Sequence, residues 1–435
     1  MKITMFKPRG SVFEDYPLGG IVLMMVLILL SPYVGVYLCY IAFLVSTYRI
    51  LRYDAKIFAA DYCVLIPVAQ FFRTAGGMSL LIWVSLIAAI WYFVRNKIRA
   101  NGALVCLVLL LNYLLLRMQT DISDFVLCFG QLFILYVLIP KQDGRSAERI
   151  IKVFCWSLLV TSVYGLALRY SPQLVAIRGK EAIAIYGMSL TRFSALLKDS
   201  NYYMTLLMIG IASLCKLKDQ GKISAPVFWM TGLPLVLFGI LSYSKTFFLV
   251  FFFFSSAYIL WQFWTKRSLK GVVFSIIGIV AVFSLIFSSG SPFAIVMKRL
   301  TSAVDLDQLT TGRSELFMRY WDAITGSPRN FLIGHGFDAP LLEKGAHNIY
   351  LEIAYYLGII GVVLMVVFYI ALLYGMQKYA QHEQKHSNIR RHAVIFVAAV
   401  LYLSLQGIFQ IVTYGGFFVA AITLLLDRRE CYVDV

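Results

Sequence analysis

Long apolar runs fill most of the chain, and short polar segments separate them. A helix that crosses a bilayer needs roughly 20 apolar residues, so the pattern predicts an all-α, polytopic membrane bundle of about 12–14 transmembrane helices. Only Ser31 and Pro32 divide the first two runs, which therefore form either a helical hairpin or one kinked helix. The candidate spans are approximately residues 16–31, 34–50, 56–73, 78–95, 102–118, 122–140, 150–170, 199–216, 226–243, 246–264, 271–288, 357–377, 392–409 and 413–428.

Basic residues follow the loops of this predicted bundle in a regular way. Lys2, Lys7 and Arg9 precede the first span, and a cluster of lysine and arginine follows every second span after it. Such clusters are typical of cytoplasmic loops. We therefore expect both termini in the cytoplasm and two sizeable segments, residues 171–198 and 289–346, on the outer, periplasmic side.

Composition agrees with a membrane protein and argues against other classes. Hydrophobic residues make up 60% of the chain and charged residues only 14%, a balance that soluble globular proteins do not approach. The formal net charge of +17 is spread over short clusters rather than one patch, which argues against nucleic-acid binding. We interpret residues 1–435 as one membrane domain, because no internal repeat, linker or removable signal peptide is apparent.

Several kinds of chemistry have no matching motif. The seven cysteines lie in apolar runs or at the C-terminus, so no disulfide framework is predicted. No Cys/His spacing resembles a zinc site. The predicted outer segments contain no Walker A, GxSxG or HExxH pattern, which argues against ATP hydrolysis and metallo- or serine hydrolysis. We therefore expect neither a metal nor another cofactor.

The longer predicted outer segment contains a short amphipathic helix over residues 313–325. Its apolar residues recur at helical spacing, and Gly326-Ser327-Pro328 ends it. The segment is too short for a separate fold, so we expect it to pack back on the bundle through Phe317, Tyr320 and Trp321. Chemistry is then expected at the boundary between membrane and water.

Three basic residues lie on the predicted outer side, where topology does not require them. They are Arg192, Lys245 and Arg313. One interpretation is that such side chains only snorkel or bind lipid phosphates. The other is a binding site for a phosphate or diphosphate, because a cation at a helix start adds to the positive end of the helix dipole. Guanidinium groups suit phosphate oxygens bidentately, whereas the lysine acts as a point charge.

His347 precedes the next apolar run and is a candidate general base for a sugar hydroxyl, because its reference pKa is near neutral. The alternative is a capping or packing histidine. On a helix that starts there, Tyr350 shares its face, whereas Glu352 points elsewhere and is interpreted as structural. His335, between two glycines, is expected to be an exposed loop residue.

Five segments occur in an order that resembles the O-antigen polymerase and O-antigen ligase superfamily of bacterial inner-membrane glycosyltransferases. They are RFSALLKDSNYY, LSYSKTFFL, GRSELFMRYWDAI, FLIGHGF and AHNIYLEIAYYLGIIGVV. The resemblance implies transfer of a glycan from an undecaprenyl-diphosphate-linked donor to an acceptor sugar at the periplasmic face. It also implies that Arg313 and Lys245 hold the diphosphate and that His347 activates the acceptor. At position 245 the family commonly has arginine, whose guanidinium can form two parallel hydrogen bonds. Lys245 offers a single point charge instead.

The remaining expectations complete the predicted site. Arg192 joins the diphosphate-binding set, and the glycan is expected to meet Arg319, Asn348 and Tyr350. Expected partners are the lipid-linked oligosaccharide, membrane lipid and a chain-length regulator protein. A polymerase, whose acceptor is another lipid-linked repeat unit, is favoured over a ligase, whose acceptor is lipid A core.

A flippase or other transporter of lipid-linked oligosaccharide is a further alternative. Transporters commonly have repeat symmetry and polar residues near the membrane midplane. Here the polar residues within the apolar runs are scattered, and most of the polar sequence lies in the predicted outer segments. The pattern therefore favours an enzyme.

Overall fold

The computed structural model describes residues 16–96, 101–117, 122–178, 182–185, 188–266, 313–337, 346, 348–383 and 411–426. The predicted spans 271–288 and 392–409 lie outside these ranges, as does much of the segment 289–346. The part of the chain that the structure describes is helical, so the all-α part of the predicted fold class is confirmed there. A short antiparallel hairpin is added to it, with β1 (Ala182–Ile185) paired to β2 (Met188–Thr191).

The first half of the chain forms eight α-helices and two short 3-10 helices over the described ranges. They are α1 (Leu18–Val34), α2 (Tyr37–Arg52), α3 (Ala55–Leu65), η1 (Ile66–Val68), α4 (Leu80–Arg95), α5 (Gly102–Arg117), α6 (Ile122–Leu138), η2 (Ile139–Lys141), α7 (Gly144–Ala167) and α8 (Pro172–Arg178).

The helices after the hairpin follow the predicted spans and the polar interval. They are α9 (Ser200–Asp219), α10 (Ala225–Leu241), α11 (Lys245–Lys266), α15 (Arg313–Thr325), α16 (Pro328–Ile333), α17 (Ile349–Glu383) and α19 (Ile411–Thr423). The bounds of α15 coincide with the range in which the sequence places its amphipathic helix.

The first two apolar runs form a helical hairpin. Helix α1 continues through Pro32 and ends at Val34. Gly35 then reverses the chain with a φ of 146°, and its N–H donates to the Ser31 carbonyl over 3.0 Å. Since α1 and α2 pack against each other, the break lies at Gly35 and not at Ser31-Pro32. A glycine is suited to this turn, because residues with a Cβ rarely adopt such a φ.

Two of the described helices are long and apolar enough to cross a bilayer: α7 and residues 349–374 of α17. Shorter apolar helices accompany them. Large apolar side chains also face outward from several helices, with exposed fractions of 65% for Leu44, 77% for Leu116 and 75% for Met230. Outward-facing apolar side chains on so many helices favour a surface in contact with lipid.

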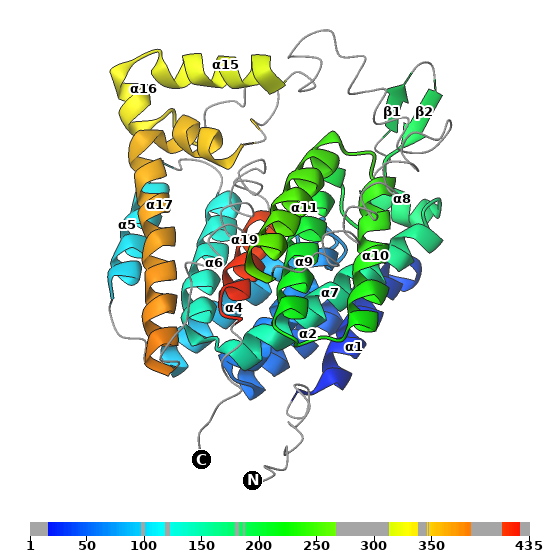
Figure 1. The fold of residues 1–435 in the computed structure, drawn as a ribbon. Coiled ribbons are helices and arrows are strands. Elements are labelled where there is room, and N and C mark those ends of the chain that lie inside the picture. The colour runs from blue at the N-terminus through cyan, green and yellow to red at the C-terminus, as the bar shows by residue number, and fades with distance from the viewer. Residues whose placement is uncertain are drawn as a thin grey trace.

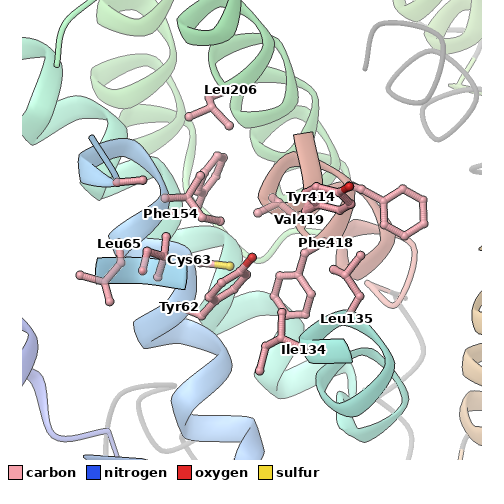
Figure 2. Close-up of a cluster of buried hydrophobic side chains, with 14 of the residues drawn as sticks. Tyr62, Cys63, Leu65, Ile134, Leu135, Phe154, Leu206, Tyr414, Phe418 and Val419 are labelled. Carbon is pink, nitrogen blue, oxygen red and sulfur yellow. The ribbon is translucent and has the colours of Figure 1, made fainter. Parts of the chain in front are cut away.

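The interior of the bundle forms where α3, α6, α7, α9 and α19 meet. Figure 2 shows this cluster, to which Tyr62, Phe154 and Phe418 contribute rings. The Tyr62 and Phe418 rings pack edge to face, with centroids 5.6 Å apart. The Tyr62 hydroxyl donates to Gln131 Oε1 over 2.7 Å, so its polar atom is satisfied inside the apolar core.

The bundle has two different ends. At one, the cap end, α15 lies across the helices and the β1–β2 hairpin is at the same end (Figure 1). At the other, the ion-pair end, Lys56 pairs with Asp143 at 2.5 Å, and Glu148 pairs with Lys152 at 2.6 Å and Lys222 at 3.4 Å. Helix α7 connects the two ends, because Asp143 caps its first turn and its last turn leads to α8.

Candidate functional site

Hydrogen bonds at the cap end tie the segment after β2 to the turn between α10 and α11. The Phe193 N–H donates to the Leu241 carbonyl over 3.3 Å. Arg192 Nε donates to the Ser242 carbonyl, also over 3.3 Å. Arg192, from the first of the five sequence segments, is therefore held against the second segment, which contains Lys245.

Lys245 is the first residue of α11, and Ser244 caps that helix. Ser244 Oγ accepts the N–H of Phe247 over 3.4 Å and donates to Asn201 Oδ1 over 3.4 Å. Asn201 Oδ1 also accepts from Arg192 Nη2 at 3.4 Å. One amide in the first turn of α9 thus connects both segments. We call Arg192, Lys245, Asn201, Ser242 and Ser244 the cation site.

The backbone is strained on both sides of this site. Among the described residues, the non-glycine residues with positive φ are Ala195 at 48° and Tyr243 at 52°. Each such residue costs on the order of 1–3 kcal/mol and persists where the surrounding structure enforces it, commonly at functional sites. Gly165 on α7 makes room for one of them, because a Cβ there would lie 2.8 Å from the Ala195 Cα.

Phe193 anchors the segment beneath the cation site. Its side chain is fully buried, stacks on Phe238 of α10 with centroids 5.6 Å apart, and meets Tyr203 of α9 edge to face at 5.5 Å. The guanidinium carbon of Arg169, just beyond the end of α7, lies 6.0 Å from the Phe193 ring. Sequence analysis did not select Arg169. The signal for it was a basic residue at the outer end of the predicted span 150–170.

Helix α15 packs on the bundle through a narrower face than predicted. Tyr320 is fully buried and Ile324 is 2% exposed, as expected for a docked face. Phe317 and Trp321, however, are 44% and 47% exposed, so the expectation that they also dock is wrong. The apolar residues of α15 cover a wider arc than the contact needs, because positions 317 and 321 lie beside positions 320 and 324 around a helix.

The charged face of α15 is directed to solvent. Arg319, a predicted glycan-binding residue, pairs its Nη2 with Glu315 Oε1 at 2.6 Å, and both side chains are at least half exposed. Such an exposed pair contributes about 0–1 kcal/mol, so the pair with Glu315 holds Arg319 only weakly. Arg313 is the first residue of α15; its side chain lies outside the described part of the chain.

A kink in α17 joins the helix to the segment after α16. At Gly358 the φ is 65°, and the carbonyls of Tyr355 and Tyr356 accept the N–H groups of His335 (2.8 Å) and Gly336 (2.9 Å). The loop thus supplies donors for carbonyls that a continuous helix would pair internally. We call this contact between residues 334–336 and the kink at Gly358 the glycine joint.

Helix α5 supports the glycine joint from the side. The Tyr113 hydroxyl donates to the Leu357 carbonyl over 2.8 Å, and Arg117 Nη2 donates to the Gly334 carbonyl over 2.7 Å. Both halves of the joint therefore have a side-chain donor from the same helix, which fixes their positions relative to the bundle.

His335 is not the exposed loop residue that its glycine neighbours suggested. Its ring stacks on Tyr355 with centroids 4.6 Å apart, its Nε2 lies 3.0 Å from the Ala323 carbonyl oxygen, and the residue is half-buried. The prediction was wrong because the backbone bond to Tyr355 turns the loop inward. His335 thereby ties α15 to α17.

Asn348 caps the start of α17. Its Oδ1 accepts the N–H groups of Tyr350 over 3.0 Å and Leu351 over 3.2 Å, the arrangement that satisfies free donors in a first helical turn. The predicted glycan-binding residues Asn348 and Tyr350 thus lie together, and Tyr350 is half-buried. His347, the predicted base, lies outside the described residues.

Glu352, which the sequence places away from the face of His347, is a buried carboxylate. It is 6% exposed, in the first turn of α17, and its charge interacts with Tyr202 of α9, Tyr320 of α15 and Tyr414 of α19. Burial, followed by the neighbouring Glu352 and Tyr355, raises the pKa of Tyr320 to about 12. A carboxylate is favoured near a helix N-terminus, so the dipole of α17 offsets part of its desolvation.

The described part of the chain is thus a helical bundle with outward-facing apolar side chains and basic residues at its cap end. Residues 230–366 match the family model described as O-antigen ligase. The resemblance to the superfamily of O-antigen polymerases and ligases, whose members are glycosyltransferase-like enzymes, is thereby confirmed. The matched segment contains Lys245, α15, α16 and the glycine joint. Comparison with curated proteins and with solved structures found no match.

Proposed function

We propose that this protein is a multi-pass inner-membrane glycosyltransferase that polymerises O-antigen or a related surface polysaccharide. It transfers glycan from an undecaprenyl-diphosphate-linked donor to a lipid-linked repeat unit at the periplasmic face. The observation that carries the proposal is that Arg192 and Ser244, the residue before Lys245, both donate to Asn201 at one end of the bundle. A ligase, with the same donor and lipid A core as acceptor, is the second candidate, because the matched family model is described as O-antigen ligase.

Charge distribution supports the orientation of the bundle. The ion-pair end carries many basic residues, which lie in the first turn of α3, in the first three turns of α7, or at the end of α9 and in its following loop: Lys56, Arg145, Arg149, Lys152, Lys216, Lys218 and Lys222. Basic loops collect on the cytoplasmic side. The cap end, with the cation site, then faces the periplasm, where lipid-linked repeat units would be presented.

The chemistry of the cation site suits a diphosphate. Arg192 offers a planar guanidinium, which can bind two phosphate oxygens at once, and Lys245 offers a compact point charge. Lys245 also stands at the start of a helix capped by Ser244, where the helix dipole adds positive potential. Both features stabilise negative charge on a departing diphosphate.

The proposed reaction is one displacement. A hydroxyl oxygen of the acceptor sugar attacks the anomeric carbon of the donor as His347 takes the hydroxyl proton. The bond between that carbon and the diphosphate oxygen breaks, and undecaprenyl diphosphate leaves with the electron pair. A positioned base contributes on the order of 100-fold to 10,000-fold to such a step.

Reconstitution tests this proposal. Purified protein in liposomes, supplied with lipid-linked repeat units and no ion gradient, should lengthen the glycan; movement of unextended substrate across the bilayer would indicate a transporter instead. A deletion strain then separates the two enzymes. Loss of the polysaccharide ladder with a single repeat retained means polymerase, whereas loss of all repeats with accumulation of lipid-linked polymer means ligase.

A further inference from the structure

Arg169 lies beside the cation site, although neither the sequence motifs nor the matched segment includes it. It follows the last residue of α7 by two positions. Its guanidinium carbon lies 6.0 Å from the centre of the Phe193 ring and 5.6 Å from that of Tyr170. Because Phe193 follows Arg192 directly, Arg169 is held near the segment that carries Arg192.

The position of Arg169 is set by the backbone around it. The N–H of Arg169 donates to the Leu166 carbonyl over 3.2 Å, and the N–H of Ser171 donates to the Leu168 carbonyl over 2.9 Å. One turn earlier, Gly165 lets α7 approach Ala195 so closely that a Cβ there would lie 2.8 Å from the Ala195 Cα. The end of α7 and the segment that carries Arg192 are therefore packed as one unit.

Arg169 also stands at the edge of the bundle. Its neighbours on α7 and just beyond are apolar or aromatic and face outward, with exposed fractions of 53% for Val163, 40% for Leu166 and 73% for Tyr170. Arg169 itself is half-buried. It is thus placed between these outward-facing side chains and the buried Phe193, the residue after Arg192.

We propose that Arg169 is a further diphosphate-binding residue and that it holds the phosphate group that bears the polyprenyl chain. This inference rests on the proposed function. Arg192 and Lys245 then bind the phosphate nearer the sugar, and the polyprenyl chain leaves the site along the apolar side of α7. Arg169 is assigned to the lipid-bearing phosphate because, of Arg169, Arg192 and Lys245, it is the one beside the outward-facing apolar residues of α7.

The same guanidinium chemistry also suits the phosphate of an ordinary anionic lipid headgroup, so the test must separate the two sources. Three variants are informative. Arg169→Met keeps an unbranched aliphatic stem of similar length and removes the charge. Arg169→Lys keeps the charge and removes the fork. Arg73→Met is the control, because Arg73 is an arginine at the same end of the bundle, in the loop after η1. Nearby Gln70 accepts the N–H of Lys198 at the cap end.

The measurement is binding of geranylgeranyl diphosphate and geranylgeranyl monophosphate to full-length protein in phosphatidylcholine vesicles. Arg169→Met should weaken diphosphate binding by about 10-fold to 100-fold, the effect of losing a charged hydrogen bond. Arg169→Lys should recover part of the affinity, and Arg73→Met should match the wild type. The monophosphate, which carries the lipid-bearing phosphate alone, should remain sensitive to Arg169→Met.

Two results would overturn the assignment. One is wild-type affinity of Arg169→Met for both probes. The other is a loss of binding that appears only when phosphatidylglycerol is added to the vesicles, which would make Arg169 a headgroup site. The binding assay needs no glycan transfer, so the two proposals fail separately. Wild-type protein that binds the diphosphate but never extends a glycan would contradict the proposed function alone.

Discussion

Gly334 and Gly358 meet backbone to backbone. A Cβ on Gly334 would lie 2.5 Å from the amide nitrogen of Gly358, and a Cβ on Gly358 would lie 2.5 Å from the amide nitrogen of Ile333. Both residues have positive φ, 70° and 65°. The FLIGHGF and YYLGIIG segments are therefore two halves of one contact, in which glycine is needed for space and for conformation.

Alanine at either half of the glycine joint should destabilise the protein. Gly334→Ala and Gly358→Ala each introduce a clash with backbone and a strained φ, which costs on the order of 1–3 kcal/mol or more. The control is Gly232→Ala inside α10, where a Cβ would meet nothing within 4 Å. Thermal unfolding in detergent measures the difference. Equal melting temperatures for Gly334→Ala and Gly232→Ala would contradict the joint.

Substitution of the basic residues should show whether diphosphate binding needs a bidentate guanidinium or only a positive charge. Arg313→Ala and Arg192→Ala should lose most transfer activity, and the corresponding lysine variants should recover only part, because one charge then replaces two parallel hydrogen bonds. Lys245→Arg should be tolerated. Lys218→Ala, near the end of α9 at the ion-pair end, is the control. If the Arg313→Ala variant, at normal protein level, still made glycan of normal length, the proposed anion-binding site would be contradicted.

Orientation in the membrane can be checked by labelling. Gly76 lies in an exposed loop at the cap end, and Ser224 precedes α10 at the ion-pair end and is exposed. In a background without reactive native cysteines, an impermeant thiol reagent added to spheroplasts should label Gly76→Cys and not Ser224→Cys. The reverse pattern would place the cation site in the cytoplasm and exclude periplasmic transfer.

Tyr320 should make the docking of α15 sensitive to alkaline pH. Burial raises its pKa to about 12 in the folded protein, above the value of roughly 10 for a free tyrosine. Its contribution to stability is therefore full below pH 10 and is lost as the pH rises through 12. Tyr320→Phe should lose less stability than wild type between pH 10 and 12, as followed by thermal unfolding. Parallel losses would show that Tyr320 does not titrate with unfolding.

Glu352→Gln tests whether the buried carboxylate matters through its charge. The substitution keeps the size of the side chain and removes the charge that acts on Tyr202, Tyr320 and Tyr414. We expect the melting temperature to change little and the catalytic rate to fall about 10-fold or more, because positioning at the start of α17 is altered. Glu148→Gln, equally buried at the other end, is the control. A loss of stability without a loss of rate would make Glu352 structural.

Local spacing was enough to predict some elements but not their contacts. The apolar period and the Gly-Ser-Pro stop define α15, which runs over Arg313–Thr325 as expected. The same pattern could not separate Tyr320, which docks, from Phe317 and Trp321, which do not, because that choice depends on α17. The role of Gly334 was equally hidden, since it depends on a partner in another element.

The sequence predicted the residues of the site only in part, for a similar reason. Arg192 and Lys245 were predicted as site residues because they are cations outside the expected basic loops. The structure brings their segments together through Asn201. Arg169 was passed over because it ends an apolar run, where a basic residue looks like an ordinary helix terminus. Only the packing of α7 against Ala195 and Phe193 shows which site it adjoins.

The hydrogen bonds between the two halves of the glycine joint run from main chain to main chain, so they do not depend on the exposed side chains around them. Met318, Phe331 and Leu332 are all exposed near it, and changing them leaves the hydrogen bonds to Tyr355 and Tyr356 intact. A library that randomises these positions while keeping Gly334 and Gly358 would vary the surface above the site without moving its scaffold. If the proposed function holds, altered glycan preference could then be selected independently of folding.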